Sequence, residues 1–165
     1  MELQDVDPEQ IREVYARFGY TMYQAQCVER QIAILLATCF NPNFAKSNPT
    51  ERDRAFDTEF EKTMGRLIVR LSQRVRIPSD LAQRMQSALE VPNFLAHDYF
   101  WERSDQFLSL QGQQSMIDEL AEYGAVLKAL DATLTDVGDR WCEKVGITEE
   151  MVEAELKKLH DEGHA

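Results

Sequence analysis

"MIDELAEYGAVLKALDATLTDVGDRW", residues 116–141, is the most regular stretch of the sequence and decides the expected fold. Its apolar side chains recur at alternating spacings of four and three residues, which places them on one stripe of a helix. A stripe of about seven turns requires partner helices along its whole length. Its members are Met116, Leu120, Tyr123, Leu127, Leu130, Leu134, Val137 and Trp141.

A second long helix is predicted near the amino terminus. Asp7 can cap this helix, and Pro8 suits its first position. Apolar residues between Ile11 and Cys39 follow the same spacing, and Glu29 is the one break in their stripe. The sequence "NPNFAKSNPT", residues 41–50, contains two Asn-Pro steps and predicts a loop that stops the helix.

Two further main helices are expected, one within residues 51–75 and one from Leu81, with Ser79 or Asp80 as its cap. Pro92 should kink or break the latter, because an internal proline removes a helical hydrogen bond and costs ~3 kcal/mol or more. Gly146 should end the long carboxy-terminal helix.

A short final helix is expected from Thr148 through Leu159. The sequence shows no strand pattern and no repeat. It therefore predicts one all-α domain over residues 1–165, an up-and-down bundle of four main helices with a short helix within 146–165.

Composition limits the classes of function. The chain has 165 residues, of which 44% are hydrophobic, enough for one domain with its own core. Lys and Arg number 18 against 29 Asp and Glu, a formal charge of -11, which disfavours general nucleic-acid binding. Cys27, Cys39 and Cys142 have no paired spacing and are expected to be apolar fillers in a reducing compartment. With no apolar run and an acidic start, we expect a cytoplasmic protein without membrane contact.

The sequence contains no motif that indicates a bound metal or cofactor. A di-iron bundle needs Glu-x-x-His on two helices, but the residue three before His97 is Phe94, and the other histidines are His160 and His164. Phosphate-binding glycine loops and nucleophile-elbow serines are also missing from the sequence. We therefore predict no metal and no cofactor.

Asn93 and His97 are the chemically suggestive pair, because residues four apart share a helix face. A histidine can transfer protons near neutral pH, and a neighbouring asparagine can orient it or hold a phosphate oxygen. The alternative is a partly buried histidine satisfied by a hydrogen bond. Glu29 also has two possible interpretations. As a buried carboxylate it would need a partner such as His97, Arg84 or Arg103. Alternatively, it lies at the edge of its apolar stripe and needs none.

The sequence "NFLAHDYFWE", residues 93–102, preceded by residues 63–90, resembles the HEPN superfamily of small helical bundles. The resemblance in helix order covers roughly residues 10 to 140. The family motif is an Arg, then four to six residues of which the first is polar, and then a His. Asn93 and His97 match the last two elements, whereas Pro92 stands where the Arg is expected. The resemblance implies a homodimer, and in many members a metal-independent ribonuclease in which Arg and His of two subunits meet.

Two other features suggest binding. Arg66, Arg70 and Arg74 stand four apart and form a basic stripe that can hold a phosphate backbone or pair with carboxylates. Tyr99 belongs to a run of aromatic residues that can stack on bases or pack in the core.

The resulting hypothesis is a HEPN-like, non-catalytic, dimeric binding or regulatory module with a protein or RNA partner. One alternative is an active endoribonuclease that uses His97 with an arginine from elsewhere in the dimer. Another is a helical protein-interaction module with no nucleic-acid role.

Overall fold

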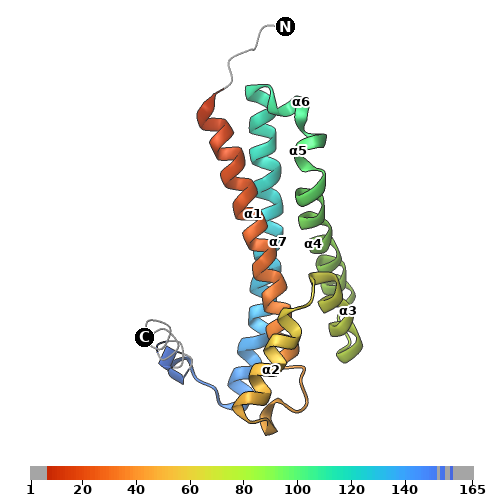
Figure 1. Ribbon diagram of the computed structural model, residues 1–165, viewed down its shortest axis with the longest axis vertical. Helices are drawn as coiled ribbons and strands as arrows, with labels where there is room; N and C mark the ends of the chain where they lie inside the picture. Colours follow the sequence, from red (N-terminus) through yellow and green to blue (C-terminus); the bar gives the residue numbers. More distant parts are fainter. Residues whose placement is uncertain (1–6, 152, 155–156, 158–165) are drawn as a thin grey trace.

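The computed structural model describes residues 7–151, 153–154 and 157, and every regular element among them is helical (Figure 1). The all-α fold expected from the sequence is confirmed. The helices form an elongated bundle in which α1 and α7 run through nearly the whole length. None of the described helices combines the length and the apolar character that a membrane span requires.

Helix α1 (Pro8–Ala37) and helix α7 (Leu110–Val145) are the two helices that the apolar stripes predict. Asp7 caps α1 by accepting the N–H of Glu9 at 2.9 Å. Ser109 caps α7 by accepting the N–H of Gly112 at 3.1 Å. Gly146 ends α7 in the left-handed conformation (φ +77°), as expected for a glycine at this position.

The segment predicted as one helix within 51–75 is two antiparallel helices, α2 (Pro49–Phe60) and α3 (Met64–Arg74), so the single-helix prediction is wrong. A capping box between Asn48 and Glu51 starts α2 inside the predicted loop, which also contains the 3-10 helix η1 (Phe44–Lys46). The chain reverses at residues 61–63, because a carboxylate from α1 supplies a new helix start at Met64.

The additional reversal of the chain at residues 61–63 changes the relative direction of the two long helices, α1 and α7. Four alternating helices would make the first and last antiparallel, whereas five make them parallel. Thr21 of α1 contacts Leu120 of α7, and Leu35 of α1 lies near Gly138 of α7, so both helices run in the same direction. Helix α4 runs against them (Figure 1).

Helix α4 (Ser79–His97) continues through Pro92, so the helix does not break and restart at the proline. Ala88 and Leu95, on either side of Pro92, are buried and hold the segment against its neighbours. Ser79 and Asp80 lie in the first turn of α4 and do not cap it. The chain then turns through α5 (Tyr99–Glu102) and α6 (Ser104–Phe107).

The short final helix is described only at its start. Residues 149–151 are helical, and Thr148 accepts the N–H of Met151 at 3.3 Å. The predicted end of this helix at Leu159, like His160 and His164, lies outside the described residues.

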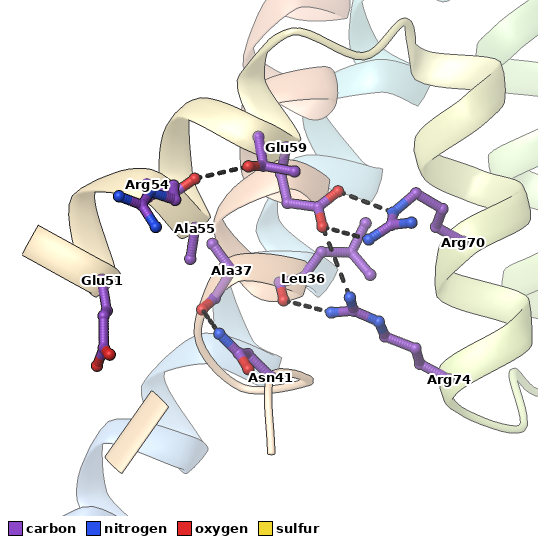
Figure 2. A pocket seen from close by; sticks show the side chains of 10 residues that line it. Leu36, Ala37, Asn41, Glu51, Arg54, Ala55, Glu59, Arg70 and Arg74 are labelled. Carbon is purple, nitrogen blue, oxygen red and sulfur yellow. Dashed lines mark hydrogen bonds and ion pairs between the residues drawn. The ribbon is translucent and has the colours of Figure 1, made fainter. Parts of the chain in front are cut away.

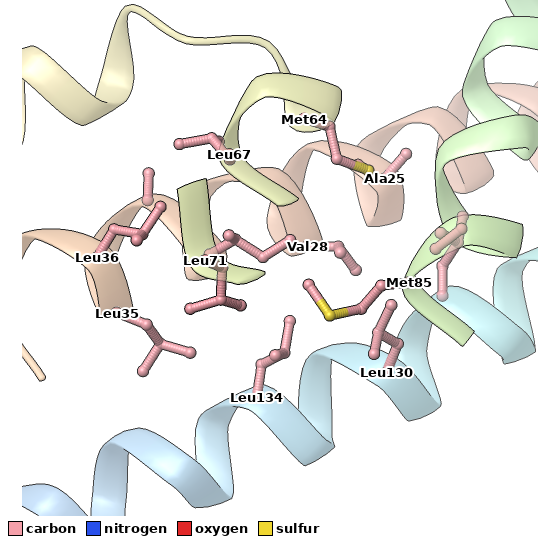
Figure 3. Close-up of a cluster of buried hydrophobic side chains, with 14 residues drawn as sticks. Ala25, Val28, Leu35, Leu36, Met64, Leu67, Leu71, Met85, Leu130 and Leu134 are labelled. Carbon is pink, nitrogen blue, oxygen red and sulfur yellow. The ribbon is translucent and has the colours of Figure 1, made fainter. Parts of the chain in front are cut away.

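The core has two parts. The larger cluster joins α1, α3, α4 and α7, and Figure 3 shows Val28, Leu71, Met85 and Leu130 meeting in it. The smaller cluster lies toward α5, where Tyr99 is surrounded by Val14, Leu95, Met116 and Leu120. Helices α1, α4 and α7 contribute to both clusters, but α3 contributes only to the first.

Candidate functional site

Asn93 and His97 lie one turn apart on the outward face of α4, and both are exposed. Neither side chain forms a hydrogen bond or ion pair with another described residue. The alternative of a partly buried, hydrogen-bonded histidine therefore does not hold. Asp98 ends α4 directly after His97, and Trp101 follows with 85% of its surface exposed.

The two arginines closest in sequence to His97 are bound elsewhere in the bundle. Arg84 donates to the carbonyl of Ala129 and the hydroxyl of Thr133 on α7, both at 3.0 Å. Arg103 donates to both carboxylate oxygens of Glu119, at 2.7 and 3.0 Å. Neither guanidinium is therefore available to replace the missing motif arginine within its own chain.

The Arg103–Glu119 pair belongs to a polar network that also includes two tyrosines. The hydrogen bonds and charge of Arg103 hold the pKa of Glu119 below its ordinary value, with a further hydrogen bond from Tyr123 at 3.1 Å. Burial, followed by the charge of Glu119, raises the pKa of Tyr99. Tyr99 is fully buried and donates to the carbonyl of Met116 at 3.3 Å, so it cannot stack on a ligand at the surface.

Glu29 has a partner that the sequence did not suggest. Its Oε2 accepts the backbone N–H of Met64 at 2.8 Å, at the first residue of α3. Thr63, the residue that precedes α3, forms no side-chain cap, so Glu29 performs this role from α1. The expected partners His97, Arg84 and Arg103 are not bonded to it.

A cavity of about 570 Å³ between α1, α3 and α4 brings together three residues that the sequence singled out. Glu29, Pro92 and Asn93 all line it, although Glu29 lies on α1 and the other two lie on α4. Its other lining residues are mainly apolar: Met22, Ala25, Gln26, Thr63, Met64, Gly65 and Leu89. His97 does not line the cavity.

The basic stripe on α3 serves the packing of α2. Arg70 donates to both carboxylate oxygens of Glu59, at 2.7 and 3.0 Å, and Arg74 lies 3.6 Å from the same carboxylate (Figure 2). Arg74 also donates to the carbonyls of Leu36 and Phe40 at the end of α1. Of the three arginines, Arg66 alone is exposed without a partner among the described residues.

Glu59 is the residue that the sequence analysis missed. It is 4% exposed. Burial would raise the pKa of this carboxyl, but the hydrogen bonds and charge of Arg70, with Lys62, outweigh burial and lower it. The only signal in the sequence is an acidic residue placed before a row of arginines, which does not reveal that the chain reverses between them.

Within the described part of the chain, no group of His, Cys, Asp and Glu side chains is arranged to hold a metal ion. Cys27, Cys39 and Cys142 are free and half-buried. Comparison with protein-family models, with curated proteins and with solved structures gives no significant match to this chain.

Proposed function

We propose that this chain is a HEPN-like, non-catalytic binding module that acts as a homodimer, with a second copy seated on the outward face of α4. The proposal rests on the resemblance of residues 93–102 to the family motif, in which Asn93 and His97 are present and Pro92 replaces the arginine. The observation that carries it is the commitment of Arg84 and Arg103 to partners on α7.

The engagement of Arg84 and Arg103 with other partners argues against chemistry at His97. Cleavage of RNA without a metal requires a proton acceptor for the attacking hydroxyl and positive charge for the developing phosphorane. His97 can supply the first because it is exposed. Pro92 has neither charge nor a donor, so the motif position that should supply the positive charge does not supply it.

The exposed tryptophan favours a docking role for this face. Tryptophan carries a large apolar surface, and exposed tryptophans commonly anchor protein interfaces. Trp101 is 85% exposed and lies in α5, the helix that comes next after His97 in the chain. A second copy that covers Trp101 would remove this apolar surface from water.

The oligomeric state tests the dimer. Light scattering at micromolar concentration should give twice the chain mass of 19.1 kDa for the unmodified protein and a lower mass for Trp101→Ala. Tyr23→Ala is the matched control, because Tyr23 is an aromatic side chain that is 58% exposed on a different helix, α1. A monomer mass for the unmodified protein contradicts the dimer.

Incubation with RNA in EDTA tests the absence of catalysis. We expect no cleavage by the unmodified protein and none by His97→Ala. Cleavage that appears only in Pro92→Arg supports a degenerate motif, provided that the variant retains the native circular dichroism. Cleavage by the unmodified protein that His97→Ala abolishes would instead establish a ribonuclease that depends on His97 and would contradict the non-catalytic proposal.

A further inference from the structure

The cavity between α1, α3 and α4 lies where a bundle helix is missing. Helix α3 fills the groove between α1 and α4 only as far as Met64, where it begins. Figure 3 shows Met64 pointing toward Ala25 of α1 at this end of α3. Beyond Met64 the groove is open, with Met22 and Ala25 on one side and Leu89 and Pro92 on the other.

Glu29 gives this apolar cavity its charge. Of the described residues that line the cavity, Glu29 alone is charged, and it is half-buried. Its Oε2 is used by the N–H of Met64, whereas Oε1 accepts no hydrogen bond from a described residue. A half-buried carboxylate that lines an apolar space and has one oxygen without a protein donor favours a ligand donor that carries positive charge.

Further acceptors lie near this carboxylate. Gln26 on α1 and Asn93 on α4 are exposed, line the cavity and present side-chain amides. Their side-chain oxygens are acceptors that can supplement the carboxylate of Glu29. An ammonium group has three donors and can use several such acceptors at once.

We propose that this cavity binds a small hydrophobic amine, with the ammonium group on Glu29 and the apolar body against Met22, Leu89 and Pro92. The volume of about 570 Å³ lies within the range of small-molecule sites in proteins. No basic side chain lines the cavity among the described residues, and the net charge of -11 attracts cations to the molecule. The site shares Asn93 with the proposed dimer face, but its test measures ligand binding and not oligomeric state, so the two proposals can fail separately.

Calorimetric titration of the full chain with phenethylamine tests the site, and phenethyl alcohol is the neutral analogue. The amine should bind, and the alcohol should bind at least about tenfold more weakly, because it cannot form a charge-assisted bond. Glu29→Gln should weaken amine binding by a similar factor. The glutamine carbonyl can still accept the N–H of Met64, so α3 retains its cap. Glu90→Gln, an exposed α4 substitution outside this cavity, should leave binding unchanged.

Gln26→Trp provides a second variant that retains Glu29. Gln26 is exposed at the rim, so a tryptophan there should cover the cavity without entering the core, and amine binding should be lost. The proposal is overturned if the amine does not bind at millimolar concentration, or if the alcohol binds as well as the amine. It is also overturned if amine binding is equal in the unmodified protein and in Glu29→Gln.

Discussion

Replacing Glu59 by glutamine should weaken the attachment of α2 to α3. The Glu59 carboxylate receives two hydrogen bonds from Arg70 and also lies near Arg74 and Lys62, at 3.6 and 3.4 Å. Glutamine has nearly the same shape but no charge. The variant therefore leaves three cations close together without the carboxylate that neutralises them.

The expected cost follows from the burial of the partners. Removing one partner of a buried ion pair lowers the free energy of unfolding by about 3–5 kcal/mol when the other charge stays buried. The side chains of Arg70 and Arg74 are 34% and 32% exposed, so water can solvate part of their charge after the substitution. We therefore expect a loss of about 2 kcal/mol, which lowers the Tm of a chain of this length by ~4–8 °C.

The pH dependence gives the effect a distinctive signature. Because the pKa of Glu59 in the folded protein lies below its ordinary value of 4.5, its contribution to stability is fully present above that pH. The contribution is lost as the pH falls through the lowered pKa. Thermal unfolding followed by circular dichroism should show the full difference between Glu59→Gln and the unmodified protein at pH 7, and a smaller difference at about pH 3.

Glu61→Gln is the control for this measurement, because Glu61 is an exposed carboxylate two residues away at the end of α2. We expect its Tm to stay within about 1 °C of the unmodified protein. A Glu59→Gln variant with an unchanged Tm at pH 7 would show that the ion pair adds nothing to stability. A difference that does not shrink at acid pH would show that the charge of Glu59 is not the cause.

Two glycines and one buried threonine provide further tests by the same thermal unfolding. Gly112→Ala should destabilise the chain by about 1–2 kcal/mol, because a Cβ atom there would overlap the backbone of Gln106, whereas Gly19→Ala, in open space on α1, should stabilise it by about 0.5–1 kcal/mol. Thr21→Val should cost about 1 kcal/mol, because Thr21 is buried and its hydroxyl donates to the carbonyl of Leu120 at 2.9 Å. Equal stability of the two glycine variants, or a neutral Thr21→Val, would contradict these contacts.

The long helices could be predicted because their signals are local. Asp7, Pro8 and Gly146 are caps that act within one turn, and the apolar stripe of α7 needs no information from other helices. Met116, Leu120, Leu127, Leu130 and Leu134 are all buried, as the four-three spacing indicates. The face shared by Asn93 and His97 is equally local, since it depends only on helix geometry.

The parts that could not be predicted depend on contacts between distant residues. The reversal at residues 61–63 requires the carboxylate of Glu29 at Met64, 35 positions away. The positions of Arg84 and Arg103 depend on α7, which packs against α4 only after the chain has turned through α5 and α6. Stacking and core packing both stayed open for Tyr99, because nothing near it in sequence shows that its hydroxyl donates to the carbonyl of Met116.

Glu29 connects the fold to the proposed ligand site. In the sequence, a carboxylate that interrupts an apolar stripe implied a cost of burial. In the structure, Glu29 lies where α3 begins. On one side of Glu29, residues Ile32 and Leu36 pack in the cluster that includes α3, and on the other side Met22 faces an open cavity. A carboxylate at this boundary can start α3 with one oxygen and present the other to the cavity. The apolar stripe of α1 is interrupted at Glu29 because α3 begins beside it. The cavity beyond Met64, the first residue of α3, is the space that a ligand can use.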